Sequence, residues 1–330
     1  MTQLQAPESI ETERRRRRKK KTGLARRESR LGVALILPTV LVVALVVVFP
    51  LIWNIALSFQ DARLINIREV SIIGFEPTLN NYETVIGASD FWPVLRTTLI
   101  YTVAGTILSV AMGLWAALAL LNAFRGRALV RGLVLFPYVV PVIAAAFVWK
   151  IMLNPNFGIA NVWLERLGFD AVDFLNTRTY DISMFGIFTI TVPLALLTVI
   201  AFEAWRYFPF AFLFLLAALQ SMPKDIEEAA MVDGATISQR FWYLTLPALR
   251  PVIAVLVLLR FIWTFNKFDD VFLLTGGGSG TKVITVKIIE WLTGRGNVGA
   301  AAALGIVLAL LLIVLVVIYL KFSYREEGTA

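Results

Sequence analysis

The sequence predicts an all-α polytopic membrane protein with six transmembrane helices. Hydrophobic residues make up 58% of the 330 residues and charged residues only 16%, and the mean hydropathy is +0.75. This composition leaves too few polar residues to cover an ordinary water-soluble surface. Several apolar stretches also reach the roughly 20 residues that a helix needs to cross about 30 Å of hydrocarbon.

The six predicted spans form one transmembrane domain, residues 31–322. Their approximate limits are residues 31–58, 94–121, 132–153, 187–219, 248–271 and 300–322. Proline lacks a backbone N–H, so we expect interruptions at Pro137 and Pro141 in the third span and near Pro209 in the fourth. Trp163 and the leucines beside it predict a short interfacial helix in the external segment before the fourth span.

Both ends of the chain are predicted to be cytoplasmic. Residues 1–30 form a polar segment that we expect to be disordered, and the basic run 14–21 supplies much of the net charge of +8. A basic cluster before an apolar helix keeps its own side in the cytoplasm and attracts anionic lipid. We prefer this interpretation to a nucleic-acid-binding arm. Residues 323–330 form a second, short cytoplasmic tail.

The residue types present exclude most enzymatic chemistry. The chain contains no Cys and no His, which excludes disulfides, thiolate metal sites and imidazole proton relays. The glycine-rich run 276–280 precedes Lys282, but Thr281 stands where a phosphate-binding loop needs glycine. We therefore expect no catalytic site, no metal site and no bound cofactor in this chain.

A polar hairpin, residues 221–247, separates the fourth and fifth spans. Acidic residues lie at the start of its first helix, where the positive end of the helix dipole favours them, and Gly234 supplies a residue that can end a helix with positive φ. Thr236 and Gln239 have the spacing of a capping box for a second helix, which we expect Pro247 to stop. The predicted structure is helix, turn, helix.

The hairpin resembles the EAA signature of binding-protein-dependent ABC importer permeases. The matching residues are Glu228, Ala229, Ala230, Asp233, Gly234, Ala235, Leu246 and Pro247. In that family the hairpin is the coupling helix, which inserts into a groove of the cytoplasmic ATPase. Further stretches, at residues 80–82, 138–141, 205–210 and 265–277, resemble elements of the carbohydrate class of maltose-type permeases.

The resemblance implies the type I importer fold in a bacterial cytoplasmic (inner) membrane. It also implies the partners: a second permease in a heterodimer, two ATPase subunits that bind ATP and Mg, and a periplasmic or lipid-anchored binding protein that delivers a sugar. The sugar-contacting positions of the family correspond here to Tyr138, Val142, Glu203, Arg206, Tyr207, Phe210, Arg260, Thr264 and Lys267. Aromatic rings suit the apolar faces of sugars, and polar groups select hydroxyls.

Four of these positions are charged, although the maltose permease is mostly polar or apolar there. An ionisable group at that depth costs at least about 2.5 kcal/mol, so it needs a partner or a function. One explanation is internal pairing, of Glu203 with Arg206 and of Lys267 with Asp269 or Asp270. The other is an anionic sugar derivative bound by the excess of positive charge, to which Arg260 would contribute.

Two other classes of function remain as alternatives. A secondary transporter driven by an ion gradient would need more acidic or histidine relays within the spans, where Glu203 is nearly alone. A membrane enzyme acting on lipid-linked sugar would need paired carboxylates or metal ligands at a membrane edge, and none are evident in the sequence.

Overall fold

The computed structural model describes residues 32, 34–71, 74–184 and 188–327. The predicted disordered tail, residues 1–30, and the last three residues lie outside these ranges. Five helices are long and apolar enough to cross a membrane, and a bent pair of shorter helices supplies the equivalent of a sixth span. The long helices are Ala34–Ser58, Phe91–Ala119, Leu194–Ser221, Ile237–Phe265 and Val298–Lys321.

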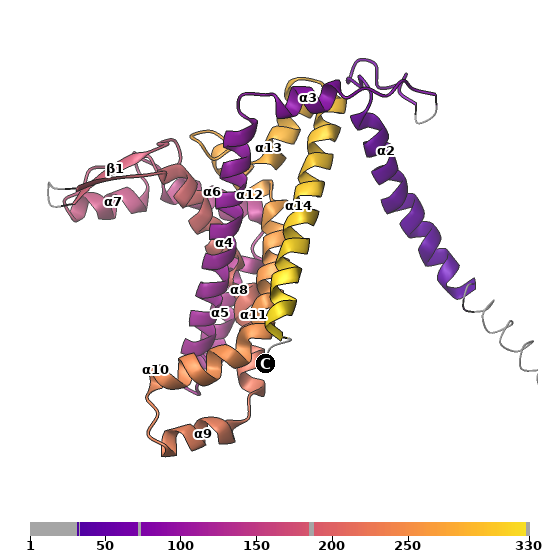
Figure 1. Ribbon diagram of the computed structural model, residues 1–330. Coiled ribbons are helices and arrows are strands. Elements are labelled where there is room, and N and C mark those ends of the chain that lie inside the picture. Colours follow the sequence, from indigo (N-terminus) through magenta and orange to yellow (C-terminus); the bar gives the residue numbers. More distant parts are fainter. Residues whose placement is uncertain (1–31, 33, 72–73, 185–187, 328–330) are drawn as a thin grey trace, which may run out of the picture.

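The elements follow one another in a helical bundle with one small β-hairpin (Figure 1). Their bounds are Ala44–Val48 (π-helical), α2 Phe49–Ser58, α3 Asn80–Ile86, α4 Phe91–Ala119, α5 Arg127–Val139, α6 Val142–Met152, α7 Ile159–Arg166, β1 Tyr180–Met184, β2 Phe188–Val192, α8 Leu194–Ser221, α9 Lys224–Val232, α10 Ile237–Arg240, Phe241–Thr245 (π-helical), α11 Leu246–Phe265, α12 Asp269–Thr275, α13 Ile284–Ile289, Glu290–Gly294 (π-helical) and α14 Val298–Glu327.

The helix that ends in α2 stands apart from the bundle and meets it through α14 (Figure 1). The junction is held by the Asn-Tyr pair of the predicted motif. The Asn81 side chain donates hydrogen bonds to the carbonyls of Ser58, at 3.0 Å, and Gln60, at 2.7 Å. The Tyr82 hydroxyl lies 2.8 Å from the Ser58 hydroxyl. These residues therefore fasten α3 to the end of α2.

The centre of the bundle is the contact between α4 and α8. A Cβ added at Gly113 of α4 would lie 2.6 Å from the Cβ of Ala211 and 2.9 Å from the Phe208 carbonyl, so only glycine allows this approach. Helix α8 continues without a break through Pro209, and the break predicted there is wrong. Pro209 is buried, and close packing against α4 keeps the helix continuous across the missing hydrogen bond.

The third predicted span is bent by 97° between α5 and α6. Val140 is extended, with φ −63° and ψ 136°, because a residue before proline is pushed out of the helical region. Pro141 then opens α6. The interruption expected at Pro141 is therefore present, and it leaves the Val140 carbonyl outside the helix. The one expected at Pro137 is wrong, because Pro137 lies inside α5.

Two predicted span limits, residues 187 and 271, differ clearly from the structure. Residues 188–192 form strand β2, paired antiparallel with β1, where the fourth span was expected to begin at 187. Four consecutive β-branched residues in β2, Thr189 to Val192, favour this hairpin. The fifth span ends at Phe265 rather than 271, because Asn266 turns back to donate to the Ile262 carbonyl at 2.8 Å.

Pro247 does not stop a helix, contrary to the prediction. The π-helical turn Phe241–Thr245 joins α10 to α11, and Pro247 sits in the first turn of α11. The wider π turn shifts the hydrogen-bond register, so the missing N–H of proline is tolerated. One continuous helix thus runs from the tip of the polar hairpin into the fifth span.

The turn of the hairpin has the predicted chemistry. Gly234 has φ +79°, and the Ala235 N–H donates to the Ala230 carbonyl at 2.9 Å. Thr236 and Gln239 form the capping box that opens α10. The hairpin thus has a fixed geometry, and it projects from the bundle at the end opposite α3 (Figure 1).

We predict that Gly234→Ala loosens this turn. Nothing lies within 4 Å of an added Cβ at Gly234, so its only penalty is the positive φ, about 1 to 2 kcal/mol. Hydrogen exchange of the Ala235 amide should rise about 5- to 30-fold. Gly132→Ala in α5 is the control, since its Cβ also meets nothing and its φ is not positive. Equal exchange in both variants would contradict the strain argument.

A second prediction concerns pH at the other end of the domain. The Lys282 ammonium lies 2.6 Å from Glu290 and lowers the pKa of that carboxyl below its usual value. Because the folded pKa is depressed, the pair stabilises the fold above the unfolded pKa and this stability is lost as pH falls through the folded pKa. Protection of the Asn297 amide, which bonds the Trp291 carbonyl, should fall below about pH 4.5. Glu290→Gln should remove this step, and an unchanged step would contradict the assignment.

Candidate functional site

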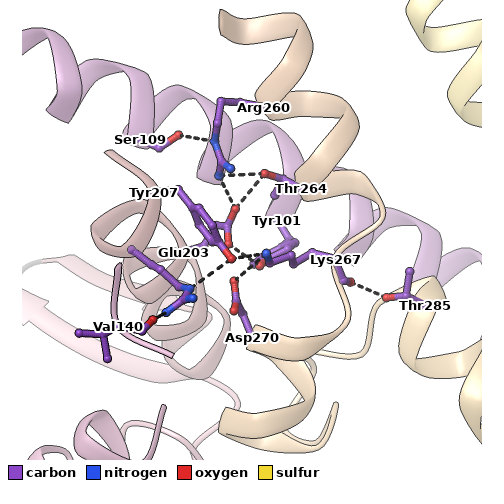
Figure 2. Close-up of polar contacts among 11 residues, drawn as sticks. Tyr101, Ser109, Val140, Glu203, Tyr207, Arg260, Thr264, Lys267, Asp270 and Thr285 are labelled. Atoms are coloured by element: carbon purple, nitrogen blue, oxygen red, sulfur yellow. Dashed lines mark hydrogen bonds and ion pairs between the residues drawn. The ribbon is translucent and has the colours of Figure 1, made fainter. Parts of the chain in front are cut away.

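A buried ion pair between Glu203 and Arg260 lies at the centre of the polar cluster inside the bundle (Figure 2). Arg260 of α11 approaches the Glu203 carboxylate of α8 to 2.5 Å, and the two side chains are 1% and 0% exposed. The Thr264 hydroxyl, one turn after Arg260, donates to the same carboxylate oxygen at 2.8 Å. Two helices are thus joined by opposite charges in an apolar interior.

Helix α4 completes the surroundings of this pair. The Tyr101 hydroxyl donates to the second oxygen of Glu203 at 3.2 Å, and Arg260 Nε donates to the Ser109 hydroxyl at 3.4 Å. A buried ion pair is favourable only when its remaining donors and acceptors are also satisfied. Both oxygens of Glu203 meet this condition.

Lys267 and Tyr207 form a second layer towards α12 (Figure 2). The Lys267 ammonium donates a hydrogen bond to the Tyr207 hydroxyl. It also lies 3.9 Å from the Asp270 carboxylate, which is fully buried and has no hydrogen-bond partner among the described residues. The Lys267 carbonyl accepts a hydrogen bond from Thr285 at 2.5 Å, which ties the segment between α11 and α12 to α13.

Three cationic side chains lie close to the Tyr207 ring. Arg260 Cζ lies 4.4 Å from the ring centroid, Lys267 Nζ 4.1 Å and Arg206 Cζ 5.4 Å. Cations over an aromatic face are attracted by its quadrupole, so Tyr207 holds three positive side chains in one small region.

Arg206 faces the bend between α5 and α6. Its Nη1 donates to the Val140 carbonyl at 3.0 Å and its Nε to the Tyr207 hydroxyl at 3.2 Å. The predicted pairing of Arg206 with Glu203 is wrong, because Arg260 occupies the Glu203 carboxylate. Lys267 does pair with Asp270, one of its two predicted partners.

Aromatic side chains continue from this cluster to the surface. Tyr138 stands edge-on to Tyr207, with ring centroids 6.1 Å apart, and lies 6.2 Å from Phe210. Phe210 in turn contacts Phe214, at 4.8 Å, and Trp263, at 5.1 Å. The rings of Tyr138, Phe214 and Trp263 are nearly half exposed. An aromatic face is therefore open next to the charged groups.

The nine expected sugar-contacting residues separate into two groups. Glu203, Arg260 and Thr264 are closed inside the subunit. The others are less deeply buried or exposed: Tyr138, Val142, Arg206, Tyr207, Phe210 and Lys267.

Three further residues belong to the cluster and were not predicted from the sequence: Tyr101, Ser109 and Trp263. A buried tyrosine in an apolar helix needs a hydrogen-bond partner, which was the available signal for Tyr101. The described residues contain no group of three His, Cys, Asp or Glu side chains that could hold a metal.

The polar hairpin is the second candidate site. Glu228 and Asp233 are exposed, whereas Leu246 and Pro247 are half-buried at the base. Arg240 braces the two arms through an ion pair of 3.2 Å with Glu227. Large apolar side chains are exposed around the turn: Ile226, Met231, Val232 and Ile237. Such a surface is typical of a segment that docks on another protein.

Comparison with known families decides the kind of protein. Residues 109–325 match the model of the binding-protein-dependent transport system inner membrane component family. The chain belongs to this family. The trehalose/maltose transport system permease protein MalF of Thermococcus litoralis is 33% identical over 308 residues, 92% of this chain and 97% of the relative. The chain is a permease subunit, which is a transporter component rather than an enzyme.

Two solved structures share the fold of this permease. A chain of a bacterial ABC transporter involved in import of the acidic polysaccharide alginate superposes with a TM-score of 0.77, at 22% identity, over 92% of this chain and 99% of that one. The alginate ABC transporter in complex with an alginate pentasaccharide-bound periplasmic protein gives 0.75, at 23% identity, over 91% and 96%. The permease thus has the type I ABC importer fold.

We predict that breaking the central pair destabilises the permease more than removing it. Glu203→Gln leaves the Arg260 charge buried without a counter-ion, which costs about 3 to 5 kcal/mol. Glu203→Gln combined with Arg260→Met should recover part of the loss in thermal midpoint of the purified complex. Glu227→Gln, which breaks an exposed pair, is the control and should cost no more than about 1 kcal/mol. A double variant less stable than Glu203→Gln would contradict the pairing.

Proposed function

We propose that the chain is one of two unlike permease subunits of an ATP-driven importer that takes up a saccharide. The observation that carries the proposal is the cluster around Tyr207, where half-exposed aromatic rings stand beside buried polar groups that can select hydroxyls. A relative named for trehalose and maltose transport, similar over nearly its whole length, supports a saccharide as the solute.

The solute would meet the chain at six positions on the open side of this cluster. They are Tyr138, Val142, Arg206, Tyr207, Phe210 and Lys267. Glu203, Arg260 and Thr264 would hold these groups in place from behind, through the ion pair and through Tyr207. The second permease would close the other side of the pathway.

The polar hairpin would couple this site to ATP hydrolysis. In this proposal the hairpin and both chain ends are cytoplasmic, in a bacterial inner membrane, and Glu228 to Ala235 dock on one of two ATPase subunits that bind ATP and Mg. An external binding protein would deliver the solute at the opposite side. The turn at Gly234 and the continuous helix from Ile237 to Phe265 support this role. A displacement of the hairpin would move this helix, and with it Arg260 and Thr264.

We predict that Glu228→Lys uncouples transport. The substitution reverses an exposed charge on the proposed docking face, so uptake in proteoliposomes containing the whole complex should fall at least about tenfold, the effect of roughly 1.4 kcal/mol. Solute-stimulated ATP hydrolysis should fall with it, while the permease pair still assembles.

The control is Glu165→Lys, the same charge reversal at an exposed site on α7, far from the hairpin (Figure 1). It should transport like the unmodified complex. Normal uptake by the Glu228→Lys complex would remove the hairpin from the mechanism.

A further inference from the structure

Arg206 differs from the other buried cations of this chain. Among the described residues, three cationic residues are buried: Arg206, Arg260 and Lys287. Arg260 pairs with Glu203 and Lys287 with Asp90. Arg206 is 8% exposed, yet no described carboxylate lies within ion-pair distance of it.

The bonds that Arg206 makes are to neutral groups. Nη1 donates to the Val140 carbonyl and Nε to the Tyr207 hydroxyl, whereas Nη2 has no hydrogen-bond partner among the described residues. A buried guanidinium without a counter-ion is unfavourable and implies that a negative charge is supplied from elsewhere. The bend carbonyl and Tyr207 fix the planar group from two sides and leave one terminal nitrogen for that charge.

No acid of the cluster forms an ion pair with Arg206. The cluster contains three cations, Arg206, Arg260 and Lys267, and two acids, Glu203 and Asp270. Glu203 is hydrogen-bonded to Arg260, and the Asp270 carboxylate lies 3.9 Å from the Lys267 ammonium without a hydrogen bond. One positive charge therefore remains, and it lies at Arg206, close to the Tyr207 ring on which Tyr138 packs edge-on.

We propose that Arg206 is the specificity-determining residue for an anionic saccharide, whose carboxylate or phosphate it binds through Nη2. This inference rests on the proposed function and names the substrate class of the same site. The sugar ring would lie against Tyr138 and Phe210, and the anionic group would reach inward to the guanidinium. Arg260 is not the anion-binding residue, because its charge is already neutralised by Glu203.

The test uses the complete reconstituted transporter with its own binding protein. Two matched pairs of solutes are the probes: methyl glucoside with methyl glucuronide, and trehalose with trehalose 6-phosphate. They separate a carboxylate from a phosphate and each anion from its neutral counterpart. Uptake and solute-stimulated ATP hydrolysis are measured for each.

Arg206→Gln should lower uptake of the anionic member about ten- to a hundredfold, because a charge-assisted hydrogen bond is lost. Any uptake of its neutral counterpart should change by less than about threefold. Arg206→Lys keeps the charge but loses the planar guanidinium, so it should lower uptake of the anionic member less than Arg206→Gln does. Arg68→Gln makes the same change in an exposed loop and should leave uptake unaltered.

Three results would overturn the proposal. One is a complex that takes up only the neutral members. Another is an equal loss for both members of a pair in Arg206→Gln. The third is failure of Arg206→Gln to assemble, with recovery on neutralising an acid of the second permease, which would make Arg206 a subunit contact. A complex that transports none of the four would refute import of this kind of mono- or disaccharide, whereas the first three results leave saccharide import standing.

Discussion

The arrangement of the permease core depends on the buried ion pair between Glu203 and Arg260. Two charges in an apolar interior must be paired and hydrogen-bonded, so α8 and α11 are held at a fixed register where these side chains meet. Helix α4 satisfies the remaining hydrogen-bonding groups of the pair. Tyr101 donates to the second Glu203 oxygen, and Ser109 accepts from Arg260 Nε. The close contact at Gly113 allows α4 to reach this position. One electrostatic requirement thus joins three of the longest helices.

The same pair decides which charges remain for a solute. Because Glu203 is occupied by Arg260, it cannot neutralise Arg206 one turn further along α8. Arg206 instead donates a hydrogen bond to the Val140 carbonyl, which lies outside the helix at the bend before Pro141. Tyr207 connects the buried ion pair with the less buried residues of the cluster, because its ring lies against Arg260 and its hydroxyl accepts a hydrogen bond from Lys267. The fold therefore separates structural charges from accessible ones along a single helix.

Patterns local in the chain predicted much of this fold. Apolar length located the long helices, and capping chemistry located the turn at Gly234 and the box at Thr236. Errors arose where packing overrides local preference. Pro209 stays helical because α4 covers it, and a π turn absorbs Pro247. Helical spacing suggested Glu203 with Arg206, whereas the real partner is 57 positions away. Such a pair depends on how two helices pack together, and residue spacing within one helix does not reveal this packing.

The most direct test of the account is an experimental density map of the assembled transporter without solute, at a resolution that shows side chains. The Glu203 carboxylate should contact the Arg260 guanidinium and the Thr264 hydroxyl, with Tyr101 on its other oxygen. Arg206 should face the bend at Val140 with no acid of this chain beside it. Glu203 paired with Arg206 across one helical turn, with Arg260 turned towards the translocation pathway, would contradict it.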